Sequence, residues 1–235
     1  MTLSAGEQAG ITVPQIVADL FTARFAGQPA WAVLTEVFIG LGWLRAGVSK
    51  VIDPSWQSGN YLTGFLIDHQ DDTVGWYSPF VDTFVSGNTQ TVSAIVLVMQ
   101  FVVAASLLTG QVRSIGLGLG IGMNLHFLAA GSVDPSAFYL LAQIALVFLL
   151  LDRWPAHERR VLLPSVASAG LATAALNLPF VRTVHPAEVI RDPAIMFATL
   201  GSLVCLACIV SLADSAEPAE SNDGQLESNR DGASV

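Results

Sequence analysis

Six long runs of apolar residues, nearly free of charge, dominate this sequence. An α-helix needs roughly 17–25 mainly apolar residues to cross a bilayer. Only 12% of the residues are charged, whereas a soluble domain carries about a quarter. The pattern therefore predicts an all-α integral membrane protein. The predicted spans are residues 31–50, 91–110, 113–131, 136–153, 160–178 and 193–213.

Arginines indicate how these spans are oriented. Arg24 precedes the first span, Arg113 follows the second, and the connection 152–160 contains three arginines. With six spans these places lie on one side, which the positive-inside rule makes cytoplasmic. We therefore expect a multi-pass protein of the plasma membrane with both termini in the cytoplasm.

The spans divide the chain into four parts. Residues 1–29 are predicted to be a cytoplasmic segment whose amphipathic helix, 12–25, lies on the membrane surface. Residues 30–153 are predicted to form a four-helix membrane domain, and residues 154–213 an additional transmembrane hairpin. The acidic residues 214–235 are predicted to be a disordered cytoplasmic tail.

The connection after the first span, residues 53–89, is long and rich in aromatic side chains. Loops of this length are usually either functional or disordered, and the aromatic content argues against disorder. We expect short helices in the outer membrane interface, where aromatic rings are favoured.

Several polar side chains interrupt the apolar runs, at a cost that makes each one a candidate for function. Glu36 and Arg45 are nine residues apart on the first span and therefore point to opposite faces. A rise of about 1.5 Å per residue along each helix places several of these polar side chains at a similar depth in the outer half of the membrane. This group consists of Arg45, Asn124, His126 and Gln143, with Lys50 at the mouth.

Two interpretations of this group are open. In the structural one, Arg45 reaches to the outer surface and the amides bond neighbouring helices. In the functional one, the group binds the polar head of a quinone, a sulfur oxyanion or a lipid phosphate. Arg45, Asn124, Gln143 and Lys50 would then bind the substrate. His126 would exchange a proton with it, and Glu36 would connect protons to the cytoplasm.

Other chemistry is disfavoured. His126 is the only histidine clearly inside a span, so it cannot supply both axial ligands of a haem. No set of residues has metal-ligand spacing, and the chain is too acidic for nucleic-acid binding. The Cys205 and Cys208 pair is expected to pack as small apolar side chains.

Two stretches resemble the DoxX family. Residues 35–51 resemble its first span, with Gly47 and Lys50 giving a Gly-x-x-Lys ending. Residues 123–138 resemble a second family stretch, in which Asn124, an aromatic residue, an Ala-Gly pair and an Asp-Pro pair follow in order. The DoxD-like small subunit of thiosulfate:quinone oxidoreductase is the most similar branch.

The resemblance implies a four-helix bundle in a prokaryotic plasma membrane, with redox chemistry at the quinone pool and a second protein subunit as partner. A quinone would be bound without a covalent link. The long loop and the last two spans depart from the family pattern, so thiosulfate is in doubt as a substrate. The alternatives are a non-catalytic scaffold or accessory subunit of a membrane complex and, less favoured because inverted repeats are not evident, a transporter.

Overall fold

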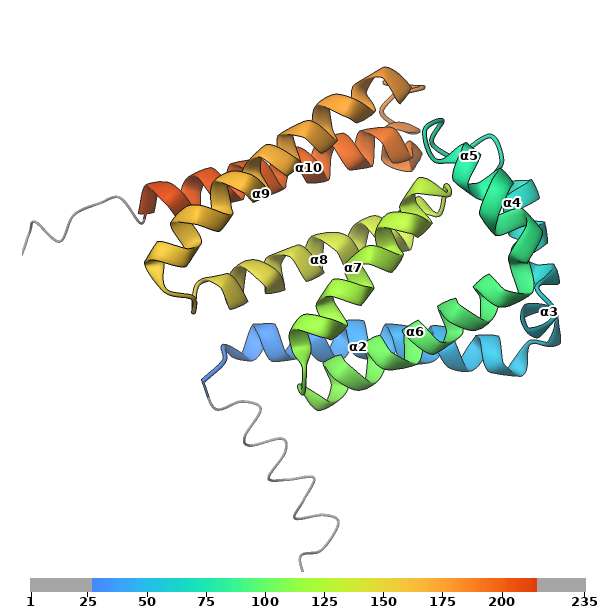
Figure 1. Cartoon of the computed structure of the whole chain (residues 1–235), viewed down its shortest axis with the longest axis horizontal. Helices are drawn as coiled ribbons and strands as arrows, with labels where there is room; N and C mark the ends of the chain where they lie inside the picture. The colour runs from blue at the N-terminus through green and yellow to red at the C-terminus, as the bar shows by residue number, and fades with distance from the viewer. Residues whose placement is uncertain (1–26, 215–235) are drawn as a thin grey trace, which may run out of the picture. The chain divides into compact units, whose positions relative to one another are not determined.

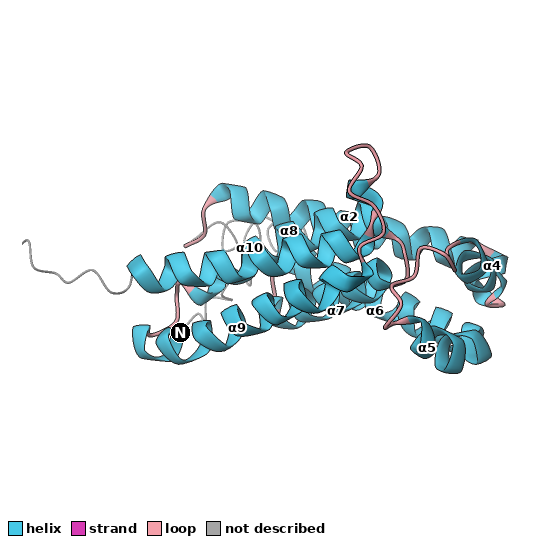
Figure 2. Cartoon of the chain, turned by 90° about the horizontal axis from the view of Figure 1, so that it is seen from above, coloured by secondary structure: helices cyan, strands magenta, loops and turns pink. Residues whose placement is uncertain are grey.

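The computed structural model describes residues 27–214, and within that range it contains helices and their connections but no strand (Figure 2). A helix forms at each of the six predicted spans. The expected surface helix 12–25 lies outside the described residues, as does the expected tail beyond Asp214. The six helices are α2 (Ala30–Ile52), α6 (Thr89–Thr109), α7 (Arg113–Ala129), α8 (Val133–Leu151), α9 (Ala156–Asn177) and α10 (Pro193–Asp214).

Five stretches of the described residues are long and apolar enough to cross a membrane, which fits a multi-pass membrane protein. They are Ala30–Ile52, Ser78–Thr109, Val133–Leu151, Ala156–Phe180 and Pro193–Asp214. The sixth predicted span, α7, has 17 residues. At about 1.5 Å per residue it is about 26 Å long, shorter than the roughly 30 Å hydrocarbon core. Both termini lie on the same side of the membrane only if α7 also crosses it. Since α7 is not among the five candidate spans, the cytoplasmic position of both termini stays a prediction.

The chain divides into two compact units, and the first holds most of the helices. It runs to Leu150 and also includes Arg182–Pro193. Within it, α6 lies along α2 and α7 packs against α6 (Figure 1). Buried side chains of all four helices α2, α6, α7 and α8 form one core, in which Ile39, Leu107, Leu117 and Leu146 are almost fully buried.

Small residues allow α7 to approach its neighbours on one face only. A Cβ atom at Gly116 would lie 2.5 Å from the hydroxyl of Ser106, and one at Gly120 would overlap the amide nitrogen of Gln143. Gly118 and Gly122 have open space around them. The face of α7 that carries Gly116 and Gly120 therefore packs against helices of this unit.

The connection between α2 and α6 folds into the expected short helices. We call residues 53–88 the aromatic segment. Asp53 caps its first helix by accepting hydrogen bonds from the hydroxyl and the backbone nitrogen of Ser55, which lower the pKa of Asp53. The elements in order are α3 (Pro54–Gln57), α4 (Asn60–Asp68), α5 (Ser78–Phe80), the π-helical turn η1 (Val81–Val85) and the 3₁₀ turn η2 (Ser86–Asn88).

The second unit comprises Leu151–Val181 and the residues from Ala194 onward. Its two long helices, α9 and α10, touch backbone to backbone. A Cβ atom at Gly201 would lie 2.5 Å from the carbonyl oxygen of Gly170. Cys208 on α10 is fully buried and Cys205 half-buried, both as free thiols. Two short 3₁₀ turns lie between α9 and α10 in sequence: η3 (Leu178–Phe180), which belongs to this unit, and η4 (Val189–Arg191), which belongs to the first.

We expect Gly201→Ala to destabilise the α9–α10 pair by about 1–3 kcal/mol, because the added methyl group meets backbone that cannot move aside without separating the helices. Thermal unfolding in detergent would measure the loss. Gly122→Ala is the matched control, since its methyl group would enter open space. Equal melting temperatures for the two variants would contradict close packing at Gly201.

Candidate functional site

An apolar cavity of about 400 Å³ lies between the aromatic segment and helices α6 and α7. Its volume is within the range of about 300–1,000 Å³ that is typical of small-molecule sites. Aromatic and aliphatic side chains form most of the wall, which is a lining suited to a flat, apolar ligand. The polar groups in the wall are few: Lys50, Tyr61, Tyr77, His126 and Ser132.

His126 reaches this cavity with one ring nitrogen already engaged. The hydroxyl of Tyr77 lies 2.9 Å from His126 Nδ1. Tyr77 is only 8% exposed, and burial raises its pKa to about 12, so the phenol is protonated at neutral pH. Since a buried hydroxyl proton needs an acceptor, we assign Tyr77 as donor to Nδ1. The neutral imidazole then carries its proton on Nε2 and can donate it to a ligand.

Lys50, like His126, was predicted from the sequence as a site residue and lines the cavity. Its ammonium lies 4.6 Å from the centre of the Trp56 ring, close enough for a cation–π interaction. The indole nitrogen of Trp56 in turn donates to the carbonyl oxygen of Ser93 at 3.1 Å. Trp56 is thereby fixed to α6, and Lys50 is held against the ring.

Several side chains that line the cavity are also exposed on the surface of the protein. Tyr61, Phe80, Phe84 and Ile95 all line it, and each leaves roughly half of its surface uncovered. Three of them, Phe80, Phe84 and Ile95, belong to the stretch Ser78–Thr109 that is apolar enough to cross a membrane. The cavity therefore has part of its wall in a stretch that is suited to contact with lipid.

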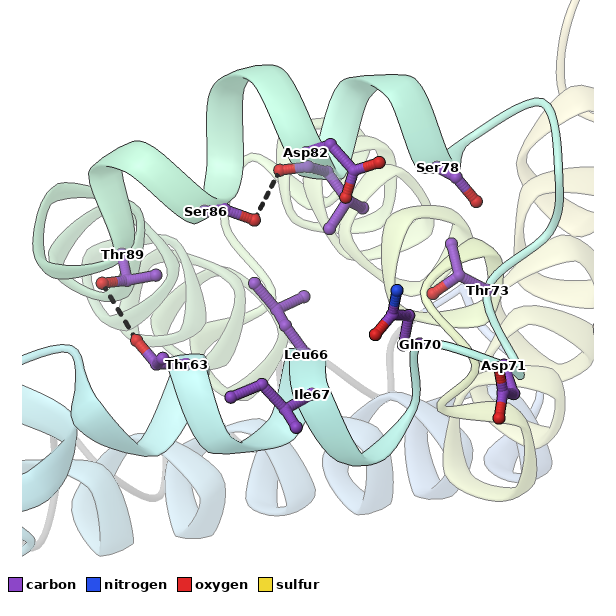
Figure 3. A pocket seen from close by; sticks show the side chains of 11 residues that line it. Thr63, Leu66, Ile67, Gln70, Asp71, Thr73, Ser78, Asp82, Ser86 and Thr89 are labelled. Carbon is purple, nitrogen blue, oxygen red and sulfur yellow. Dashed lines mark hydrogen bonds between the residues drawn. The ribbon is translucent and has the colours of Figure 1, made fainter.

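The other face of the aromatic segment is polar. A second cavity of about 380 Å³ shares Leu66 and Val81 with the apolar one but is lined mainly by hydroxyl, amide and carboxylate groups (Figure 3). At one end, Thr63 on α4 donates to the hydroxyl of Thr89 at 3.3 Å. The segment is therefore amphipathic, with an apolar cavity on one face and a cavity lined mostly by polar residues on the other.

Asn124 and Gln143 meet, but inside the helix bundle and not in the cavity. The side-chain nitrogen of Asn124 donates to the side-chain oxygen of Gln143 at 2.9 Å, and both residues are almost fully buried. Neither lines the cavity, although Met123, the neighbour of Asn124, does. For this pair the structure agrees with the structural interpretation, in which the amides join neighbouring helices.

The two charges of the first span are separated, as their spacing predicts. Glu36 is 1% exposed and forms an ion pair with Arg113 at 3.4 Å, at the first turn of α7. Arg45 lies on the opposite face of α2 and is exposed. The expected meeting of Arg45 with His126, Asn124 and Gln143 is not observed, because burying the Glu36 face turns Arg45 outward.

Sequence reasoning missed Tyr77 as the partner of His126, and it missed the cavity itself. Two pairs of aromatic residues four apart, Tyr61 with Phe65 and Phe80 with Phe84, line the cavity. That spacing puts each pair on one face of a helix. It was the available signal that these rings share one apolar site.

Among residues 27–214 no group of three or more histidine, cysteine or acidic side chains is arranged to hold a metal ion. The chain matches no family model, no curated protein and no solved structure. The likeness to the DoxX family, and the four-helix arrangement that it implies, stay predictions.

We expect Tyr77 to ionise near pH 12. A free phenol, in contrast, ionises near pH 10. The folded state retains the phenolic proton to a higher pH than the unfolded chain does. The contribution of Tyr77 to the free energy of unfolding is therefore complete below about pH 10 and is lost as the pH rises through about 12. The phenolate absorbance of the wild type minus that of Tyr77→Phe isolates Tyr77 from the other two tyrosines. A difference that titrates near pH 10 would show that Tyr77 is exposed to solvent.

We expect Asn124→Leu and Gln143→Leu each to lower the free energy of unfolding by about 1–3 kcal/mol, because each leaves a buried amide without its partner. The double variant should lose less than the sum of the two, because it removes both partners. Unfolding by denaturant in detergent measures all three, with the exposed Gln90→Leu as control. Strictly additive losses would contradict a direct bond.

Proposed function

We propose that this protein is a membrane subunit that binds a quinone in the apolar cavity and acts with a partner protein. One observation carries the proposal: His126, whose Nδ1 lies 2.9 Å from the Tyr77 hydroxyl, lines a cavity with mostly aromatic and aliphatic walls, several of whose side chains are exposed. A quinone has a flat ring, carbonyl oxygens that accept hydrogen bonds, and an apolar tail. Each of these parts has a counterpart in the cavity.

The lining favours a quinone over a small anionic reductant. Tight binding of an anion relies on several charge-assisted hydrogen bonds, and among residues 27–214 Lys50 is the one lysine or arginine in the wall. Arg45, which the sequence placed beside it, is exposed on the other face of α2. In the proposal, His126 donates to a quinone carbonyl and delivers one of the two protons that reduction to the quinol takes up, the second coming from solvent, while the partner protein supplies the two electrons.

Glu36 has no direct role in binding the quinone in this proposal. It does not line the cavity, and its ion pair with Arg113 ties α2 to the first turn of α7. Removing one member of a buried ion pair leaves an uncompensated charge. A structural role for Glu36 is therefore sufficient, and a proton link to the cytoplasm is an additional part of the proposal.

A non-catalytic accessory subunit is the second candidate, and the position of Arg45 favours it. Arg45 stands in a stripe of exposed apolar side chains on α2 that includes Leu41, Val48 and Ile52. A charge in an apolar stripe needs a lipid phosphate or an acidic partner. An acidic group on a second subunit would meet that need.

We expect the wild type in lipid nanodiscs to bind a short-chain ubiquinone analogue, measured by quenching of tryptophan fluorescence. His126→Phe keeps a ring but loses the donor, so its affinity should fall about tenfold, the equivalent of one hydrogen bond of about 1.4 kcal/mol. His157→Phe is the matched control, because His157 is exposed on α9.

Unchanged affinity in His126→Phe would contradict the proposed site, and absence of wild-type binding would contradict the quinone. In the second case the accessory role is tested by whether Arg45→Gln releases a protein that co-purifies with the wild type in mild detergent.

A further inference from the structure

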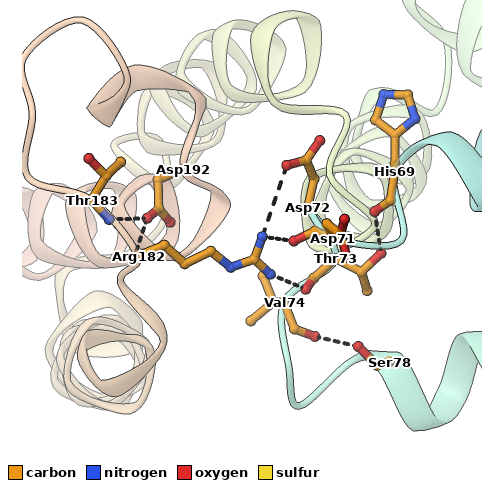
Figure 4. A network of polar contacts seen from close by, with 9 residues as sticks. All are labelled: His69, Asp71, Asp72, Thr73, Val74, Ser78, Arg182, Thr183 and Asp192. Carbon is orange, nitrogen blue, oxygen red and sulfur yellow. Dashed lines mark hydrogen bonds and ion pairs between the residues drawn. The ribbon is translucent and has the colours of Figure 1, made fainter.

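Residues 182–193, which connect α9 and α10 in sequence, belong to the first unit and contact the aromatic segment there. The guanidinium of Arg182 donates to two backbone carbonyl oxygens of that segment, those of Asp71 and Thr73 (Figure 4). Its Nη1 also lies 4.0 Å from the carboxylate of Asp72. A planar fork with several donors is the side chain suited to holding two carbonyl groups at once.

The backbone of Arg182 is itself held in place. Its amide nitrogen donates to Asp192 Oδ2 at 2.7 Å, and the amide nitrogen of Thr183 donates to the same oxygen at 3.4 Å (Figure 4). Asp192 is only 5% exposed. The guanidinium therefore projects from a braced turn.

The carbonyl groups that Arg182 holds lie a few residues from Tyr77. Directly after Thr73, the amide nitrogen of Val74 donates to the carbonyl oxygen of Ala129 at the end of α7. The amide nitrogen of Tyr77 then donates to the carbonyl oxygen of Val74 at 2.8 Å. The Tyr77 hydroxyl reaches His126, one turn before Ala129 on α7. Arg182 is thus linked to the His126 ring through residues 73–77, by hydrogen bonds at both ends of this short segment and within it.

The glycine that ends α7 brings this turn close. Gly131 has φ +93°, a conformation that residues with a side chain rarely adopt, and a Cβ atom there would lie 2.8 Å from the Cβ atom of Asp72. The turn around Asp72 is therefore packed between Gly131 and Arg182. A shift at Arg182 has little room to be absorbed before it reaches Tyr77.

We propose that Arg182 is a positioning residue for the quinone cavity: by holding the Asp71 and Thr73 carbonyl groups, it sets the place of Tyr77 and thereby the proton position and ring orientation of His126. The inference rests on the proposed function for the identity of the ligand. The effect of Arg182 on His126, however, does not depend on any ligand being bound.

The test compares Arg182→Gln with Arg191→Gln, which removes the same charge from an exposed position in the same connection. Full-length protein in nanodiscs is examined without ligand by hydrogen exchange and by the NMR signal of the His126 imidazole, assigned with His126→Phe. In Arg182→Gln we expect faster exchange in residues 69–77 and an imidazole signal moved toward that of Tyr77→Phe. Arg191→Gln should match the wild type in both.

Affinity for the short-chain ubiquinone analogue is then expected to fall several-fold in Arg182→Gln and to recover partly in Arg182→Lys, which retains one donor group. An unchanged His126 signal in Arg182→Gln and Arg182→Lys, with faster exchange only in residues 182–193, would overturn the inference. Absence of wild-type quinone binding would overturn the proposed function alone, because the His126 signal reports on Arg182 without ligand. If Arg182→Gln does not fold, Arg182→Lys is examined in its place. A His126 imidazole signal moved toward that of Tyr77→Phe would then support the inference, and an unchanged signal would overturn it.

Discussion

A polar side chain within hydrocarbon has to find its partner inside the protein, and the first unit is arranged around this constraint. Glu36 pairs with Arg113, Asn124 bonds Gln143, and Trp56 donates to a backbone carbonyl of α6. Each of these contacts joins two different helices. The polar groups that are costly in lipid therefore also determine which helix surfaces come together, because an alternative packing would leave them without partners.

The cavity follows from the same constraint applied to the aromatic segment. This segment has an apolar face rich in aromatic rings and a polar face rich in hydroxyl groups and carboxylates. Placed against α6 and α7, it bounds a mainly apolar cavity whose wall includes His126. The π-helical turn η1 contributes residues to both cavities, and π-helical turns occur frequently at functional sites.

The proposed functions differ in which surface they use. The proposed quinone binding would use the enclosed side, where the Tyr77 hydroxyl lies 2.9 Å from His126 and Lys50 lines the wall. An accessory role uses the outer face of α2, where Arg45 stands among apolar side chains. The two roles are compatible in one protein, because the opposite faces of α2 separate Arg45 from the cavity.

Much of the architecture was predictable from local pattern. Long apolar runs nearly free of charge predicted the six helices, and the nine-residue spacing of Glu36 and Arg45 predicted that their side chains point to opposite faces of α2. Depth along a helix follows from a constant rise per residue, so Asn124 and Gln143 were correctly expected at one level. The orientation of a helix about its own axis depends on its neighbours, which is why Arg45 was expected in a group that it does not join.

The sequence by itself determined the helical class, the apolar runs, the aromatic content of the 53–88 connection and the polar residues at depth, because each depends on residues close together in the chain. Only the tertiary structure decided that Tyr77 meets His126, 49 positions away, and that Arg182 holds carbonyl groups 109 and 111 positions away. A hydrogen bond between distant segments depends on how the chain turns between them. Composition and periodicity do not record that path.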